Sequence, residues 1–196
     1  MTGTRAFGLI LLVLLVAAVG IVLIVVGPQW YAADRVAGRP ATATAEPVAI
    51  RKIHATLFYV SEDGERLVPI EREVPYGDGL LEQAKRIVEA EIGSAPSPLV
   101  SALPAATKLR ALYVSGQGDA FVDFSTDLVT AHPGGSLNEL LTVYAVVDAL
   151  TANLPAVHAV QILVDGREVD TLAGHVDLRR PLAKSARWVT DAARSQ

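Results

Sequence analysis

An uninterrupted apolar run near the amino terminus constrains this chain more than any other feature. Residues 7–26 read FGLILLVLLVAAVGIVLIVV and contain no charged side chain. As an α-helix, a run of this length extends about 30 Å, which matches the hydrocarbon core of a bilayer. The sequence therefore predicts a transmembrane helix over 7–26, preceded by a short tail at 1–6.

A cleaved signal peptide is the alternative interpretation of the same run. The apolar region of a signal peptide is about 7–15 residues long and leads to small residues placed for cleavage. Here the run is longer, and the residues that follow, 27–31 (GPQWY), supply aromatic side chains typical of a membrane interface. We therefore expect a retained, single-pass anchor in the cell membrane.

The orientation of this anchor depends on the residues that flank it. Arg5 precedes the run while Arg35 and Arg39 follow it, so the distribution of positive charge hardly favours either orientation of the helix in the membrane. A short amino-terminal tail before an uncleaved anchor normally stays inside the cell. We therefore expect a cytoplasmic tail at 1–6 and a carboxyl-terminal domain on the extracytoplasmic side.

Composition excludes several classes of site and partner. The chain has no cysteine, which rules out disulfides, thiolate metal sites, a cysteine nucleophile and a lipid-modified cysteine anchor. Its formal net charge of −4 argues against nucleic acid, which needs a positive surface. The histidines show no H-x-x-x-H spacing, and GGSLN at 134–138 departs from the G-x-S-x-G nucleophile motif. We expect no enzyme activity, no cofactor and no metal centre.

Beyond the anchor the chain divides into a stalk, a folded domain and a tail. Residues 27–48 are rich in alanine, threonine and proline without an apolar period, which indicates a flexible stalk. Patterned segments then fill 49–182, which we expect to be one domain. The tail at 183–196 contains Trp188 and Val189 among charged residues, so both a short amphipathic helix and disorder are compatible with its composition.

The patterned region predicts elements in the order strand, strand, helix, strand, strand, helix, strand, strand. Apolar alternation, turn signals and helical stripes place them, in chain order, at 51–60, 66–74, 79–92, 108–114, 119–124, 137–152, 158–164 and 167–171. This order fits an α+β fold in which two helices pack on a single mixed sheet.

Each predicted helix carries signals for its start and its buried face. Ser136 and Glu139 form a capping box at the start of the second helix. Asp148 falls on or beside the apolar stripe of that helix, where a carboxylate needs hydrogen-bond donors. We expect backbone amides of a neighbouring loop to supply them, with a partner or ligand contact as the alternative. Asp78 can cap the first helix, whose apolar stripe would comprise Leu80, Leu81, Ala84, Ile87, Val88 and Ile92.

Acidic residues and a histidine gather at 163–178 (LVDGREVDTLAGHVDL), a pattern compatible with a metal or acid/base site. Asp165 and Gly166, however, are the favoured pair for a two-residue β-turn. Near the end of the stretch, His175 and Asp177 alternate with apolar neighbours. The sequence therefore favours a hairpin whose polar face meets water.

The second strand, at 66–74, is expected at a sheet edge because Pro69 lacks an N–H for the hydrogen-bonded ladder. Its charged residues at 71–73 (ERE) would discourage unwanted strand pairing. His132 precedes a proline and is interpreted as a solvated turn residue. The candidates for contact with a partner or ligand are Glu71, Arg72, His132 and Asp148.

The succession of motifs in the patterned region resembles the GerMN domain, a module of bacterial envelope proteins named for a spore germination and sporulation protein. Two positions depart from the family's pattern without threatening the fold: PAAT at 104–107 stands where a glycine turn is usual, and Asp148 where an amide is usual. The stretches that carry the likeness are YGDGLLE (76–82), SALP (101–104), TKL (107–109), AFVDFS (120–125), GGS (134–136), VQILVDG (160–166) and TLAGHVD (171–177).

This resemblance implies an extracytoplasmic, membrane-tethered module without a known catalytic role, whose fold is similar to the ring-building modules of secretion systems. In spore formers, relatives take part in envelope-spanning complexes and germination. We therefore expect a non-enzymatic envelope protein of the sporulation or spore germination type, which assembles with other envelope proteins or with itself. A binding module for a cell-wall or small-molecule ligand, sited near the loop 132–135, is the alternative.

Overall fold

The structure, a computed structural model, describes residues 51–190. The predicted tail at 1–6, transmembrane helix at 7–26 and stalk at 27–48 lie outside the described residues. Within 51–190, no helix is both long enough and apolar enough to cross a bilayer.

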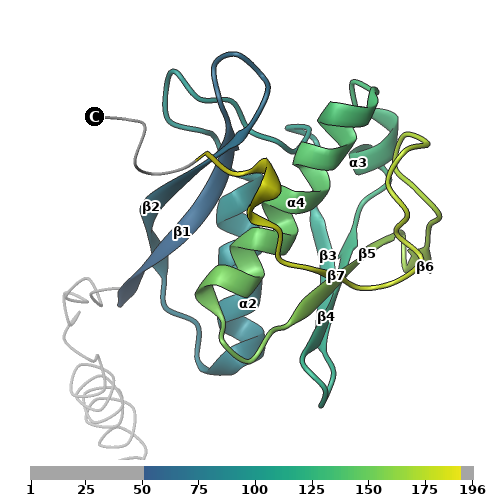
Figure 1. Cartoon of the computed structure of the whole chain (residues 1–196). Helices are drawn as coiled ribbons and strands as arrows, with labels where there is room; N and C mark the ends of the chain where they lie inside the picture. Colours follow the sequence, from purple (N-terminus) through teal and green to yellow (C-terminus); the bar gives the residue numbers. More distant parts are fainter. Residues whose placement is uncertain (1–50, 191–196) are drawn as a thin grey trace, which may run out of the picture. The chain divides into compact units, whose positions relative to one another are not determined.

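The first two strands form a sheet of their own. β1 (Lys52–Val60) and β2 (Leu67–Pro75) pair antiparallel, with Lys52 opposite Pro75 and Val60 opposite Leu67. In Figure 1 this hairpin stands apart from the other strands, on the other side of the two long helices. The expectation of a single mixed sheet is therefore wrong in this respect, because the strands form two sheets.

The other strands form the larger sheet, in the order β3-β4-β5-β6, with β7 also paired to β5. β3 (Leu109–Val114) and β4 (Asp119–Phe124) are antiparallel, whereas β4 and β5 (Ala159–Val164) are parallel. β6 (Arg167–Glu168) and β7 (Leu182–Ala183) are two-residue strands that pair with opposite ends of β5. The α+β class is confirmed.

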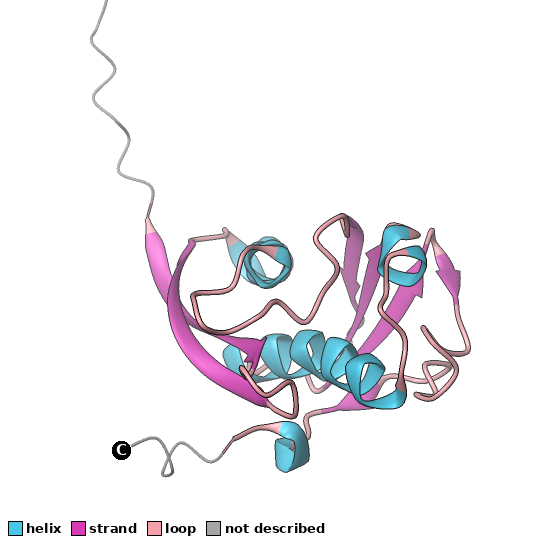
Figure 2. Cartoon of the chain, turned by 90° about the horizontal axis from the view of Figure 1, so that it is seen from above, coloured by secondary structure: helices cyan, strands magenta, loops and turns pink. Residues whose placement is uncertain are grey.

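The two predicted helices are α2 (Gly79–Ile92) and α4 (Ser136–Asn153). A short helix, α3 (Asp127–Thr130), was not predicted, since so short a segment shows no apolar period. A 3-10 turn, η1 (Ala186–Trp188), lies in the predicted tail at 183–196, for which a short amphipathic helix was one of the two alternatives. Figure 2 shows α4 lying between the hairpin and the larger sheet. It contacts β1 on one side, β5 on the other, and α2 as well.

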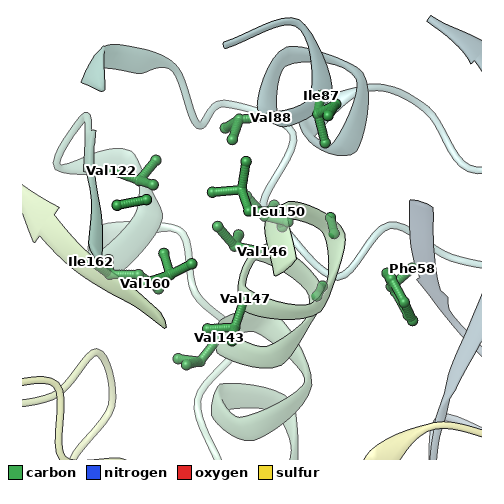
Figure 3. Close-up of a cluster of buried hydrophobic side chains, with 14 of the residues drawn as sticks. Phe58, Ile87, Val88, Val122, Val143, Val146, Val147, Leu150, Val160 and Ile162 are labelled. Atoms are coloured by element: carbon green, nitrogen blue, oxygen red, sulfur yellow. The ribbon is translucent and has the colours of Figure 1, made fainter. Parts of the chain in front are cut away.

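The hydrophobic core forms around α4. Val143, Val146, Val147 and Leu150 are each at most 1% exposed. Because neighbours surround this helix, it needs apolar side chains on more than one face. Figure 3 shows these residues facing side chains of β4, β5 and α2, among them Val122, Val160, Ile162, Ile87 and Val88.

The predicted side-chain caps of both helices are wrong, although α2 begins at Gly79 as expected and α4 begins one residue before the predicted start. Neither Asp78 nor Ser136 caps its helix, since α2 and α4 both begin without a side-chain cap hydrogen bond, and Gly135 occupies the cap position of α4. Leu80 and Leu81 are 37% and 42% exposed and do not belong to the buried stripe. They lie in the first turn of α2, and the buried face of that helix begins only beyond them.

Residues 182–190, called the strap below, connect the two sheets. β7 pairs with β5 of the larger sheet, and Val189 then forms a parallel bridge with Leu67 of the hairpin. Between these points Trp188 packs on Tyr144 of α4, with 6.4 Å between the ring centroids. The strap thus crosses α4 in front of the core in the view of Figure 1.

Candidate interaction surface

The outer edges of the hairpin can be followed residue by residue. In an antiparallel pair, opposite residues alternate between those that exchange hydrogen bonds and those whose N–H and C=O groups point outward. The N–H and C=O of Val60 bond the C=O and N–H of Val100 at 2.8 and 3.0 Å, so Val60 belongs to the outward-pointing set. Thr56 and Phe58 belong to the same set, because they lie at even intervals from it.

Side chains from the helices close the edge of β1. Asn153, at the end of α4, accepts from the N–H of Thr56 at 2.8 Å and donates to its carbonyl oxygen at 2.7 Å. The buried carboxyl of Glu91, on α2, accepts from the N–H of Phe58 at 3.1 Å. Burial raises the pKa of Glu91 well above its usual value, against the opposing effect of that hydrogen bond. The hairpin stays a separate sheet because helix side chains occupy the place of a third strand.

The outer edge of β2, in contrast, is open in its middle. Glu71 lies opposite Thr56 and Glu73 opposite His54, so the N–H and C=O groups of both glutamates point away from β1. Among residues 51–190, none of these groups has a hydrogen-bond partner. The two glutamates therefore present backbone donors and acceptors that an added strand could use.

Both ends of this open segment are blocked. Toward the start of β2, the carbonyl oxygen of Leu67 accepts from the N–H of Thr190 in the strap at 2.8 Å. Pro69 and Pro75, on either side of the glutamates, have no N–H to donate. We call the segment from Pro69 to Pro75 the open edge. The prediction that this strand lies at a sheet edge is confirmed.

Charged side chains surround the open edge. Glu73 pairs with Lys52 at 2.7 Å, while Glu71 is exposed and has no ion-pair partner among the described residues. The side chain of Arg72 donates to the Tyr59 hydroxyl of β1 at 3.0 Å and to the carbonyl oxygen of Ser94, just beyond α2, at 2.9 Å. A cavity of about 220 Å³ adjoins it, lined by Leu57, Arg72, Glu73, Ala90, Gly93 and Ser94.

His132, another predicted contact residue, belongs to a network inside the fold. Its Nδ1 accepts from the N–H of Gly134 at 3.0 Å, and its Nε2 lies 3.2 Å from the Thr142 hydroxyl. That hydroxyl donates to the carbonyl oxygen of Ala102 at 2.7 Å, so Nε2 must be the donor to Thr142. Burial lowers the pKa of His132, in keeping with a neutral ring. The interpretation of His132 as a solvated turn residue is wrong.

Asp148 is fully buried and bonds a backbone amide, as expected from its place on α4. Its Oδ1 accepts from the N–H of Ser185 in the strap at 3.0 Å, while Oδ2 is buried without a partner. Burial raises the pKa of this carboxyl to about 6, against the opposing effects of the Ser185 amide and the Lys184 charge. With 0% of its surface exposed, Asp148 is accessible to a partner or ligand only if the strap moves.

Glu139 has a role that its sequence context did not indicate. Instead of capping α4, its carboxylate accepts from the N–H groups of Leu172 and His175, both at 2.8 Å, and lies 3.1 Å from Nδ1 of His175. Burial alone would raise the pKa of Glu139, but the backbone donors of residues 172–176 outweigh it and hold the pKa below its usual value. Glu139 therefore fixes the loop that precedes the strap.

The acidic stretch at 163–178 forms a tight turn and a loop. Asp165 and Gly166 both have positive φ, 50° and 74°, and connect β5 to β6 as predicted. Beyond β6 the chain runs without a strand until β7. Within 51–190, no group of three His, Asp or Glu side chains is placed to hold a metal ion. An open cavity of about 410 Å³ beside the turn has no aromatic lining; its residues are Thr126, Val164, Asp165, Arg167, Glu168 and Val169.

Comparisons with known proteins support one family. The family model described as "Germane: Sporulation and spore germination" matches residues 56–170. No curated protein matches the chain. Among solved structures, a candidate lipoprotein from Clostridium perfringens is 23% identical with a TM-score of 0.50, covering 70% of this chain and 91% of that one.

Two further structures come from the sporulation protein GerM of Bacillus subtilis. Its tandem GerMN domains give a TM-score of 0.55 at 17% identity, covering 73% of this chain and 52% of that one. Its first GerMN domain alone gives 0.53 at 18% identity, covering 67% of this chain and 97% of that one. The chain thus spans about half of the tandem structure. At these identities the likeness shows a shared fold, that of a single GerMN domain.

The family match covers most of the patterned region, and the solved GerMN domains share its α+β fold. This chain belongs to the Germane family of sporulation and spore germination, and residues 51–190 contain its GerMN-like domain.

Proposed function

We propose that this protein is a membrane-anchored envelope component whose GerMN-like domain takes part in protein–protein assembly without catalysing a reaction. The observation that carries the proposal is the open edge of β2, where Glu71 and Glu73 direct outward N–H and C=O groups that have no partner within 51–190. An extended segment of a partner would add to this edge as a third strand of the hairpin. In such pairing, backbone hydrogen bonds supply affinity and alternate side chains supply specificity.

The charges of the open edge select the kind of strand that can pair there. Two copies of β2 placed edge to edge would bring the glutamates of one copy near those of the other, which is unfavourable. A partner strand with lysine or arginine opposite Glu71 would instead gain an ion pair. The charges that discourage pairing between copies thus favour a different, basic partner.

The anchor is the second part of the proposal. The apolar run at 7–26 has the length of a membrane span, and we infer that the domain beyond it is extracytoplasmic. The candidate lipoprotein from Clostridium perfringens, which shares the fold, has a name that implies tethering to a membrane. This chain has no cysteine for a lipid, so a transmembrane helix would serve the same purpose.

A ligand-binding module near the loop 132–135 has less support. Both ring nitrogens of His132 are engaged inside the fold, by Gly134 and Thr142. The open cavity of about 410 Å³ lies instead beside Asp165.

A proline at position 71 tests the open edge directly. Because the N–H of Glu71 points away from β1, Glu71→Pro removes a donor for an added strand while leaving the ladder of the hairpin intact. Glu71→Ala is the matched control, since it removes only the side chain. A photo-crosslinking residue in place of Glu73, in the full chain in native membranes, reports which proteins lie along the edge.

We expect crosslinked adducts in the wild-type background, reduced adducts with Glu71→Ala and nearly none with Glu71→Pro. Circular dichroism of each variant should show unchanged folding. Equal adduct yields for Glu71→Pro and Glu71→Ala would mean that the backbone of β2 takes no part in assembly, and the proposal would fail.

A further inference from the structure

Three large side chains are exposed together where β2 leads into α2. Tyr76 is 39% exposed, Leu80 37% and Leu81 42%. Glu82, which follows them, pairs with Lys85 and Arg86 at 3.7 and 3.1 Å, and Glu89 pairs with Arg86 at 3.1 Å, so these two negative and two positive charges cancel. We call Tyr76, Leu80 and Leu81 the entrance patch.

The structure holds the entrance patch rigidly. Gln83, only 8% exposed, accepts from the N–H of Gly77 at 2.8 Å and donates to the carbonyl oxygen of Pro75 at 3.4 Å. Gly77 packs so closely on α2 that an added Cβ would lie 2.4 Å from the backbone nitrogen of Gln83. A buried amide and a close backbone contact therefore fix Tyr76 beside the first turn of the helix.

The chain enters the domain beside this patch. The N–H of Tyr76 donates to the carbonyl oxygen of Arg51 at 2.7 Å, and the Arg51 guanidinium lies 4.1 Å above the Tyr76 ring. In Figure 1 the start of β1 and the start of α2 both lie at the lower end of the domain. Arg51 is the first described residue, so the segment that leads to the apolar run at 7–26 leaves the domain at this end.

We propose that the entrance patch docks onto the lipid headgroup region of the membrane that holds the chain, an inference that rests on the proposed anchor. Tyrosine, leucine and arginine are side chains suited to this interface: apolar bodies enter the acyl boundary while polar groups stay in water. Residues 27–50 would be the covalent tether that joins the domain to this anchor. Such a tether keeps a weak docking surface at an effective lipid concentration near the millimolar range.

Docking of this kind orients the domain. β1 rises from the entrance patch for nine residues, about 30 Å at the usual rise of a strand, to the turn at 61–66. The open edge of β2 would then run away from the membrane surface, accessible to envelope proteins. Since the local charges largely cancel, apolar insertion rather than attraction to anionic lipids should hold the contact, and phosphatidylcholine should suffice.

Spin labels test this arrangement, because the absence of cysteine allows a single labelled position. Asp78→Cys places a nitroxide beside the patch at an exposed residue whose side chain caps no helix. Glu62→Cys places one at the far turn as the control. The full chain is reconstituted at one copy per phosphatidylcholine nanodisc, and the accessibility of each label to an aqueous nickel reagent is compared with its accessibility to oxygen.

We expect the label at 78 to be severalfold less accessible to nickel than the label at 62. Adding Leu80→Ser and Leu81→Ser should restore its accessibility. The matched pair Val100→Ser and Leu137→Ser, which alters side chains 57% and 37% exposed elsewhere, should not.

Three results would overturn the inference. Equal nickel accessibility at 78 and 62 in nanodiscs that contain the full chain would exclude docking while leaving the anchor intact. Protection at 78 only in vesicles crowded with several copies would identify a second copy, not lipid, as the occupant. Failure of the full chain to float with phosphatidylcholine vesicles would remove the anchor and the docking together.

Discussion

Asn153 meets the backbone of Thr56 as a neighbouring strand would. Its Oδ1 accepts from the Thr56 N–H at 2.8 Å, and its Nδ2 donates to the Thr56 carbonyl oxygen at 2.7 Å and to that of Ala149 at 2.7 Å. One side-chain amide thus ends α4, joins it to the hairpin and closes the edge of β1. Glu71 lies directly opposite on β2, and its backbone groups have no partner within 51–190. The hairpin is therefore closed at the edge of β1 and open at the edge of β2.

Removing the Asn153 amide should therefore destabilise the domain. Asn153→Ala leaves the N–H and C=O of Thr56 without partners in a half-buried place, which we expect to cost about 1–3 kcal/mol in the free energy of unfolding. Urea unfolding followed by circular dichroism measures this change. Asn138→Ala is the control, because Asn138 is an exposed residue of the same helix and its amide donates to the carbonyl oxygen of Gly134, before the helix, at 2.8 Å. Similar losses for both variants would contradict the role of Asn153.

The buried carboxyl of Asp148 should make stability depend on pH. Burial raises its pKa from 3.8 to about 6, so the folded protein binds this proton more tightly than the unfolded chain does. The free energy of unfolding should therefore fall as the pH rises from about 4 to 6, and stay lower above that range. The shift corresponds to at most roughly 3 kcal/mol.

Asp148→Asn isolates this effect. The amide oxygen can still accept from the Ser185 N–H, but no charge is buried at neutral pH. We expect the variant to be about 1–2 kcal/mol more stable than the wild type at pH 7 and nearly equal at pH 4, where both side chains are neutral. Thermal unfolding at a series of pH values measures the difference. A constant difference from pH 4 to pH 7 would show that Asp148 does not titrate in this range.

Gly77 should tolerate no side chain. A Cβ at this position would lie 2.4 Å from the Gln83 nitrogen and 2.5 Å from the Glu82 carbonyl carbon, both of them backbone atoms. Gly77→Ala must displace the start of α2, which we expect to cost about 1–3 kcal/mol. Gly116→Ala is the control, because its Cβ would meet nothing within 4 Å. Urea unfolding compares the two, and equal midpoints would refute the close packing.

The local sequence pattern predicted most helices and strands. It failed where contacts between residues far apart in the sequence determine the structure. The predicted helix at 79–92 and strand at 119–124 coincide with α2 and β4, because apolar spacing and turn residues specify such segments. The division into two sheets was not predictable. It depends on Asn153 and Glu91, which meet β1 from helices 97 and 33 residues away along the chain.

The candidate interaction surface was likewise predictable only in part. Pro69 indicated an edge strand, and Glu71 and Arg72 lie on that strand. Which groups of the strand point outward follows only from the register and from the partners of Thr56. The capping-box pattern at Ser136 gave a wrong prediction, because Glu139 instead accepts a hydrogen bond from a backbone N–H of a loop 33 residues further along the chain. Nothing in the sequence near Ser136 indicates this contact.

Glu139 should hold the loop at 172–176 in place. Its carboxylate is 0% exposed and accepts from the N–H groups of Leu172 and His175 at 2.8 Å. Glu139→Gln keeps one acceptor but replaces the other oxygen with a donor that faces N–H groups. We expect this change to cost about 1–3 kcal/mol at pH 7 and to speed hydrogen exchange at 172–176. Because folding lowers the pKa of Glu139 from 4.5, its stabilising effect is complete above that value and lost as the pH falls through the folded pKa.

Asp177→Asn is the matched control for this prediction. Asp177 lies at the end of the same loop but is exposed, with a side-chain hydrogen bond to Arg179 that holds its pKa below the usual range. Its replacement should leave both the free energy of unfolding and the exchange at 172–176 nearly unchanged. Hydrogen exchange measured by mass spectrometry reports both variants on the same peptides. If Asp177→Asn loosens these residues as much as Glu139→Gln does, negative charge near the loop, and not the buried acceptor on α4, holds it.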